Sequence, residues 1–214
     1  LLQEHAPAPL LQEHAPAPLL QEHAPAPVPS PRSGSDLYLP WDQVAGYMAS
    51  TFGVQLQDFG GNGDCPVRAP MGTILGERPT NEAVSTTILR AAGYLRDTMA
   101  DWSDESSPLN PGVFSDDFTP SSYVEAIELM AVDAHSAWRS LEAADMDMNT
   151  LLHATANVLG VEIVVHSQAD LSVSWATYNR GGGATVRIFQ QGGDHFLGTV
   201  PYEPGSVSPR TRHQ

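Results

Sequence analysis

The spacing of hydrophobic residues changes at Gly160, and this change limits the possible folds more than any other feature of the chain. Before Gly160, apolar residues recur at helical spacing in several segments, most clearly from Thr80 to about Trp102. After it, short apolar runs and alternating segments follow one another, as in strands. Helices followed by strands predict an α+β domain, in which helices pack on a small, mostly antiparallel sheet.

Five segments have the hydrophobic spacing or the start signals of a helix. The expected helices cover 41–51, 67–75, 80–102, a segment that begins near Ser122 and a segment that Asn149 should cap at its N-terminus. Pro70 and Gly72 should shorten or break the second of these helices. Ser122 and Glu125 have the spacing of a capping box for the fourth. Gly160 should end the fifth.

The expected strands come mostly after the helices. They cover 161–166, 172–178, 184–190 and 195–200, and a short extended segment over 54–59 comes before the cysteine. The glycine-rich segment 179–183 has the composition of a turn, so we expect it to join two antiparallel strands as a hairpin. These strands would form a meander packed on the helices.

The first 27 residues are three identical copies of Leu-Leu-Gln-Glu-His-Ala-Pro-Ala-Pro. The two prolines in each copy interrupt helices and strand ladders, so we expect residues 1–35 to be a disordered linker. The folded domain should span residues 36–203, and residues 204–214 should form a flexible tail.

The chain carries a formal net charge of −15, which repels phosphate backbones and makes nucleic acid an unsuitable partner. No apolar run is long enough to span a bilayer. The single cysteine suits a reducing compartment. We therefore expect a monomeric domain in the cytosol, and in the cytosol of a host cell if the chain is a secreted effector or part of a larger protein.

Cys65 follows a glycine-rich turn and precedes an expected helix. The N–H groups and the positive end of a helix favour the thiolate over the thiol, and they can also hold a developing oxyanion. Gly61 and Gly63 suit a backbone that must turn tightly or lie close to a substrate. If the chain is an enzyme, Cys65 is the expected nucleophile. The structural alternative is a small buried side chain without chemistry.

A thiol nucleophile needs a base, and imidazole has the required pKa range. His195 follows a Gly-Gly-Asp turn and opens the last expected strand, so its ring can project from the edge of the sheet into a cleft. His135 and His153 lie in helical segments, and His166 ends a strand. We therefore predict that His195 is the partner of Cys65.

Three blocks of the chain resemble the OTU (ovarian tumour) family of cysteine proteases, which cleave ubiquitin from its conjugates. Residues 62–69, Asn-Gly-Asp-Cys-Pro-Val-Arg-Ala, are similar to the family motif Asp-Gly-x-Cys-x-x-Arg-Ala. Residues 149–165 resemble the helix and apolar strand of the family core, and residues 194–196, Asp-His-Phe, resemble the histidine and aromatic pair of its last core strand. The resemblance implies a papain-like OTU-type domain.

The resemblance also implies roles for individual residues. Cys65 would attack the carbonyl of the C-terminal glycine of ubiquitin, and His195 would act as general base and then as general acid. Asn62 stands where the family has aspartate, and it would keep the hydrogen-bonding shape of the turn without the charge. Gly63 and Asp64 would shape the oxyanion-binding turn. This chemistry needs no cofactor and no metal.

In many cysteine proteases, an acid orients the histidine and completes a catalytic triad. The sequence leaves open which residue would be this acid. Many family members have aspartate or asparagine two residues after the histidine, and this chain has Leu197 there. Other members take the acid from the segment before the cysteine, which makes Asp36, Asp42 and Asp58 the candidates. A dyad without an acid is the remaining possibility.

Two other functions remain open at this stage. One is a cysteine protease that processes a polyprotein or removes a ubiquitin-like modifier. The other is a ubiquitin-binding module with weak or no catalysis, which the departures at Asn62 and Leu197 favour. In each case, the expected partner is ubiquitin, a ubiquitin-like protein or one of their conjugates.

Overall fold

The computed structural model describes residues 38–168, 171, 174–192 and 195–204. The described residues all belong to one unit of the chain, which begins at Gly34. The expected linker over residues 1–35 lies outside the described residues, as does Asp36. The same is true of the expected tail, apart from Pro204.

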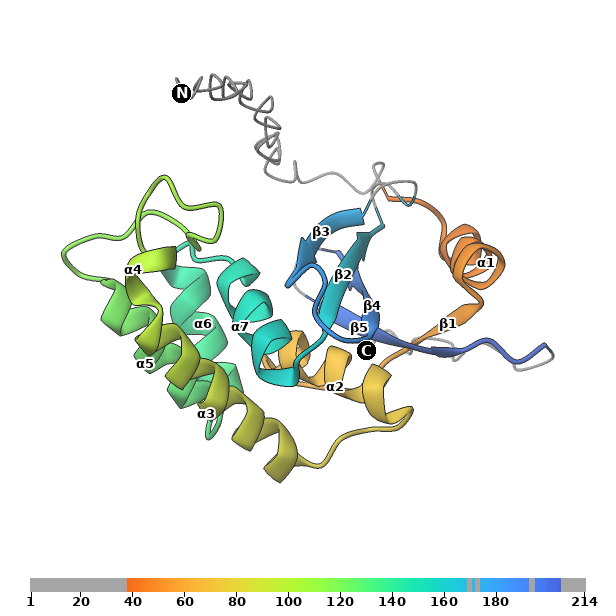
Figure 1. Cartoon of the computed structure of the whole chain (residues 1–214), viewed down its shortest axis with the longest axis horizontal. Coiled ribbons are helices and arrows are strands. Elements are labelled where there is room, and N and C mark those ends of the chain that lie inside the picture. Colours follow the sequence, from red (N-terminus) through yellow and green to blue (C-terminus); the bar gives the residue numbers. More distant parts are fainter. Residues whose placement is uncertain (1–37, 169–170, 172–173, 193–194, 205–214) are drawn as a thin grey trace, which may run out of the picture. The chain divides into compact units, whose positions relative to one another are not determined.

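The described residues form seven helices and one sheet of five strands (Figure 1). The helices are α1 (Trp41–Phe52), α2 (Cys65–Leu75), α3 (Asn81–Asp97), α4 (Met99–Trp102), α5 (Pro120–Met130), α6 (Ala134–Ala143) and α7 (Asn149–Leu159). The strands are β1 (Val54–Gln57), β2 (Glu162–Ser167), β3 (Ser174–Tyr178), β4 (Thr185–Gln191) and β5 (His195–Pro201). The α+β class predicted from the change of spacing at Gly160 is confirmed.

The strands lie in the order β1-β5-β4-β2-β3. The pairs β1–β5, β4–β5 and β2–β3 are antiparallel, and β2–β4 is parallel. The sheet is thus mostly antiparallel, as predicted. The predicted hairpin between β3 and β4 is wrong, because β2 lies between these two strands.

The segment 179–183 crosses the start of β2 instead of closing a hairpin. The Asn179 side-chain amide donates a hydrogen bond to the carbonyl oxygen of Val161, 3.0 Å away. Gly183 lies so close to the carbonyl oxygen of Gly160 that a Cβ would overlap it. Most of β2 is buried, from Ile163 to His166, as expected for a strand that has neighbours on both edges.

The two faces of the sheet pack against different helices. On one face, Val44 and Met48 of α1 form a small core with strand residues that include Phe189 and Leu197. On the other face, the neighbouring residues Ile188 and Phe196 belong to the large core that most of the remaining helices form. Because successive strand residues point to opposite faces, β5 contributes to both cores.

Helix α2 differs from the prediction in where it begins and in its continuity. It begins at Cys65 itself and runs unbroken through Pro70 to Leu75. Its first eight residues, from Cys65 to Gly72, are all buried. Packing on this scale outweighs the hydrogen bond that Pro70 cannot donate, because tertiary contacts commonly override helix propensity.

Three helix boundaries also differ from the sequence prediction. The expected helix over 80–102 divides at Thr98 into α3 and α4. The capping box of α5 is formed by Thr119 and Ser122, so Ser122 occupies its third position. Asn149 is the first residue of α7, and its backbone N–H donates to Asp147. Gly160 ends α7 in a left-handed conformation, as expected.

Candidate active site

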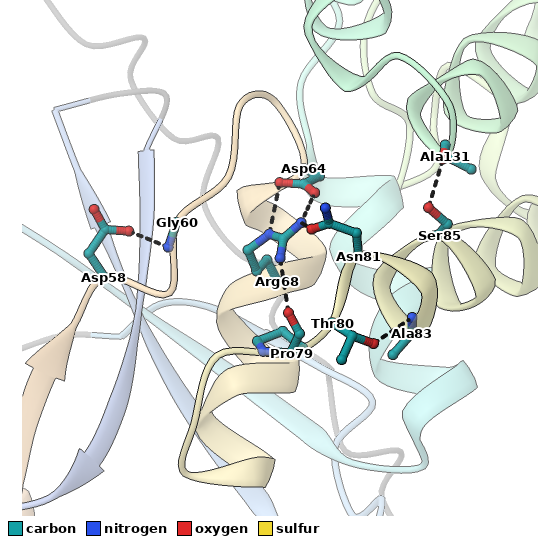
Figure 2. Close-up of polar contacts among 10 residues, drawn as sticks. All are labelled: Asp58, Gly60, Asp64, Arg68, Pro79, Thr80, Asn81, Ala83, Ser85 and Ala131. Atoms are coloured by element: carbon teal, nitrogen blue, oxygen red, sulfur yellow. Dashed lines mark hydrogen bonds and ion pairs between the residues drawn. The ribbon is translucent and has the colours of Figure 1, made fainter.

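The loop between β1 and α2 carries Asp58 at one end and Asp64 at the other, and Figure 2 shows how it arches between them. Gly60, Gly61 and Gly63 have φ values of 79°, 131° and 99°, which side-chain-bearing residues rarely adopt. A Cβ at Gly63 would also overlap the carbonyl oxygen of Ala134 at the start of α6. The loop therefore needs glycine at these positions in order to deliver Cys65 to the helix.

Cys65 is the first residue of α2 and is only 3% exposed. The carbonyl oxygen of Asp64 accepts the first hydrogen bonds of the helix, from the N–H groups of Val67 and Arg68. The thiol is thus held at the positive end of an 11-residue helix, where the dipole stabilises negative charge.

The Asp64 side chain lies beside Gly61 of the turn and forms an ion pair with Arg68. The guanidinium of Arg68 holds both carboxylate oxygens, with Nη2–Oδ2 at 2.6 Å and Nε–Oδ1 at 3.2 Å. The same guanidinium donates to the carbonyl oxygen of Pro79 and to Oδ1 of Asn81 (Figure 2). Arg68 and Asp64 are 4% and 7% exposed. This buried network ties the start of α2 to the start of α3.

His195 is the first residue of β5, and its Nε2 lies 3.5 Å from Oδ1 of Asp58. Asp58 directly follows β1, which is the antiparallel partner of β5, with Gln57 opposite Gly198. The ladder therefore brings the end of one strand to the beginning of the other. Oδ1 of Asp58 also accepts a hydrogen bond of 2.7 Å from the N–H of Gly60 (Figure 2).

Phe59 holds this arrangement together from inside the protein. Its side chain is only 1% exposed, and a Cβ at either Gly72 of α2 or Gly198 of β5 would overlap its ring. The residue next to Asp58 is therefore wedged between the helix that begins with Cys65 and the strand that begins with His195. These two elements are also joined directly, by a 2.8 Å hydrogen bond from the N–H of Thr199 to Oγ1 of Thr73.

A continuous series of contacts connects the histidine with the cysteine. His195 contacts Asp58, and Asp58 accepts from Gly60. The next residue, Gly61, lies against the backbone of Cys65: a Cβ there would be 3.1 Å from the Cys65 nitrogen. Cys65, His195 and Asp58 are thus all connected to the 58–64 loop.

The remaining predicted residues lie elsewhere. Asn62 is exposed on the loop and lines a neighbouring cavity of about 530 Å³. Asp42 is exposed in the first turn of α1, a position that suits an acid at a helix N-terminus. Leu197 is 2% exposed and packs in the small core beneath α1. An acid at this position would be buried among apolar side chains, which accounts for leucine in this chain.

Sequence reasoning missed two contributors to the site. Phe59 gave no signal, because a single aromatic residue near a glycine-rich turn is common in any core. Arg78 lies in the turn between α2 and α3, and its guanidinium packs against Gly60 of the loop. A Cβ at Gly60 would be 2.8 Å from Nη2 of Arg78. Only the folded arrangement reveals this contact.

The chain matches no protein-family model, and no curated protein matches it either. Among solved structures, it is similar to the OTU domain of OTUD1, with a TM-score of 0.52 and 17% sequence identity. The similarity covers 77% of this chain and 97% of that domain. This chain has the OTU fold. Since the sequence identity is low, the likeness to OTUD1 concerns the fold, and the chemistry must be argued from the residues of the OTU-fold domain itself.

Within residues 38–168, 171, 174–192 and 195–204, no three His, Cys, Asp or Glu side chains are grouped so that they could hold a metal ion. In the same part of the chain, every helix falls short of the length and apolar character that crossing a bilayer requires.

Proposed function

We propose that this OTU-fold domain is a thiol isopeptidase that cleaves ubiquitin from its conjugates. The observation that carries the proposal is the contact between Asp58 and His195, at a site that also holds a thiol at a helix N-terminus. Nucleophile, base and acid are the three groups that acyl transfer by a cysteine protease requires. The resemblance of residues 62–69 to the OTU cysteine motif supports ubiquitin as the modifier.

In the first half of the reaction, His195 takes the proton of the Cys65 thiol. Because Nε2 of His195 faces Asp58, Nδ1 is the nitrogen that would accept this proton. The thiolate then attacks the carbonyl carbon of the C-terminal glycine of ubiquitin and forms a tetrahedral oxyanion. Backbone N–H groups of the turn from Asn62 to Cys65 would bind the oxyanion.

The tetrahedral intermediate collapses when its C–N bond breaks and His195 gives its proton to the leaving lysine amine. Ubiquitin is then held as a thioester on Cys65. A water molecule, deprotonated by His195, attacks this thioester and releases the ubiquitin carboxylate, and the proton returns to the Cys65 sulfur. Asp58 orients the imidazole and stabilises its cationic form throughout. Its side chain is 45% exposed, so its main effect is orientation.

The burial of Cys65 favours a second candidate, a ubiquitin-binding module without turnover. A thiol that is 3% exposed must become accessible before it can attack a substrate. In the isopeptidase, the 58–64 loop would move when the ubiquitin tail binds. In a binding module, the loop would stay closed and ubiquitin would bind without cleavage.

The test is hydrolysis of an isopeptide between ubiquitin and a lysine-containing peptide, with the wild type beside Cys65→Ala and His195→Ala. The proposal predicts hydrolysis by the wild type and a loss of at least about 100-fold in both variants. Hydrolysis that survives in Cys65→Ala would overturn the assignment of the nucleophile. Binding of ubiquitin without hydrolysis by the wild type would favour the binding module. If the wild type hydrolysed only conjugates of a ubiquitin-like protein, the modifier would be that protein and the thiol chemistry would still hold.

A further inference from the structure

A polar cavity of about 530 Å³ shares the 58–64 loop with the candidate active site. Gly61, Asn62 and Asp64 of the loop form one side of it, and Asn81 and Ser85 of α3 form another. Arg68, Arg78 and the corner between α5 and α6, from Met130 to His135, complete the lining. Figure 2 shows Asp64, Asn81, Ser85 and Ala131 in this region. Any group bound here would lie beside the nucleophile turn.

Most polar groups of the lining are already engaged within the protein. Asp64 and Arg68 form the buried ion pair, and Asn81 accepts from Arg68. Ser85 donates to the carbonyl oxygen of Ala131. Asp133 accepts hydrogen bonds from the N–H and the hydroxyl of Ser136. These groups build the wall, and the exposed carboxylate of Asp133 adds a negative charge on the α5–α6 side of the cavity.

The groups that remain for a ligand are donors. Among the described residues, neither the Arg78 guanidinium nor the Asn62 amide has a hydrogen bond or an ion pair, and the same holds for the His135 ring. Arg78 is notable because the chain carries 25 acidic residues and only 10 basic ones. An unpaired guanidinium with two neighbouring donors is a site for a carboxylate.

The backbone around Arg78 is well anchored. Gly76 ends α2 in a left-handed conformation, and the carbonyl oxygen of Pro79 accepts from Arg68. The guanidinium lies in the space that a side chain at Gly60 would fill, with Cζ 3.0 Å from the position of such a Cβ. Arg78 is therefore held against the same loop that positions Cys65 and Asp58.

We propose that this cavity receives the acceptor side of the substrate, and that Arg78 binds a carboxylate near the modified lysine. This inference rests on the proposed function. The C-terminal tail of ubiquitin is basic, so the positive charge of Arg78 disfavours the tail in this cavity and favours an acidic segment of the protein to which ubiquitin is attached. The proposed cavity thus gives the enzyme a preference among acceptors.

The test compares three substrates in which ubiquitin is linked to the lysine of a short peptide. The residues that flank the lysine are glutamate in the first peptide, alanine in the second and arginine in the third. For the wild type, we expect kcat/KM for the glutamate peptide to exceed that for the alanine peptide by about fivefold, the upper range of an exposed ion pair. The arginine peptide should be the poorest substrate.

Substitutions connect this preference to Arg78. In Arg78→Gln, the ratio between the glutamate and alanine peptides should fall to about one. In Arg78→Glu, the order of the glutamate and arginine peptides should reverse. Arg139→Gln is the matched control, because Arg139 is exposed on α6 and lies outside the cavity lining. It should keep the wild-type ratio. High salt should reduce the wild-type ratio as well.

The outcomes separate this inference from the proposed function. Equal rates for the three peptides in the wild type would overturn the role of Arg78 and leave the isopeptidase intact. A glutamate preference that persists in Arg78→Gln would also overturn it. If no peptide is cleaved, and a ubiquitin carrying a C-terminal dye is not cleaved either, the proposed function fails and the inference fails with it.

Discussion

Oδ1 of Asp58 lies 3.5 Å from Nε2 of His195, although the two residues are separated by most of the chain. The contact follows from strand pairing: β1 ends just before Asp58, β5 begins at His195, and the two strands are antiparallel. In the proposed mechanism, Asp58, which directly follows β1, takes the place of the acid that this chain lacks at Leu197. This relationship is the basis of the first prediction.

Asp58→Asn should lower kcat for isopeptide hydrolysis by about 10- to 100-fold, because the imidazolium loses the charge that orients and stabilises it. KM should change little, since Asp58 is not expected to contact the substrate. Steady-state kinetics measure both constants. The matched control is Asp42→Asn, which removes an exposed acid of α1 and should retain wild-type kcat. If the wild type, Asp58→Asn and Asp42→Asn had the same kcat, Asp58 would have no role in the mechanism.

Gly72→Ala should destabilise the domain and disturb the site, because the added methyl group overlaps the ring of Phe59. Overpacking of this kind costs about 1 to 3 kcal/mol of unfolding free energy. Urea denaturation followed by tryptophan fluorescence measures the loss.

The control for Gly72 is Gly46→Ala in α1, where a Cβ meets nothing within 4 Å. There, the substitution should stabilise the domain by about 0.5 to 1 kcal/mol, as alanine does in an exposed helix interior. If the two alanine variants had the same stability, the wedge assigned to Phe59 would be wrong.

Arg68→Ala should cost about 3 to 5 kcal/mol of unfolding free energy, because it leaves the Asp64 carboxylate buried and without its partner. Adding Asp64→Ala to this variant should recover part of the loss, since the unpaired charge is then removed. Denaturation of the two single variants and the double variant gives the coupling energy. Strictly additive losses would show that the two side chains do not stabilise each other.

The sequence predicted the fold class and most of the elements, because hydrophobic spacing is a local signal. Helix α7 and strand β2, on either side of Gly160, are clear cases. The pairing of β2 with β4 could not be read in this way. Which strands become neighbours is decided by the packing of the whole sheet, and the hydrophobic spacing within one strand does not reveal it. The turn-like composition of residues 179–183 suggested that β3 pairs with β4, whereas β2 lies between them.

The candidate site was predicted in part. The sequence singled out Cys65 and His195 by residue type and position, and it offered Asp58 as one of three acids. The structure separates these acids, because Asp58 contacts His195 whereas Asp42 is exposed on α1. The ion pair between Asp64 and Arg68 was not predicted. The role of Asp64 depends on Arg68, four residues later and one turn along the helix.

We expect His166 to make the folded domain less stable at acidic pH. Burial and, as the smaller cause, the nearby charge of Arg187 together lower the pKa of His166 from 6.5 to about 4. The unfolded chain then binds more protons than the folded domain between pH 4 and 6.5. The free energy of unfolding should therefore fall as the pH drops through this range, by about 2 to 3 kcal/mol from this group.

The substitution His166→Gln isolates this contribution, because glutamine does not titrate. Urea denaturation at several pH values should give a flatter dependence between pH 4 and 6.5 than in the wild type. His135→Gln, which removes an exposed histidine, should keep the wild-type slope. If the unfolding free energy of His166→Gln depended on pH as steeply as that of the wild type, groups other than His166 would cause the pH dependence.

Covalent labelling by ubiquitin that carries a C-terminal electrophile tests the central claim most directly, because it requires the thiol, the base and the ubiquitin tail together. The wild type should form one adduct, which appears on a denaturing gel as a single shift to the mass expected for one attached ubiquitin. Cys65→Ala should form none, and His195→Ala should form it much more slowly. An adduct that persists in Cys65→Ala, or no adduct from a wild type whose Cys65 reacts readily with a small alkylating agent, would contradict the account.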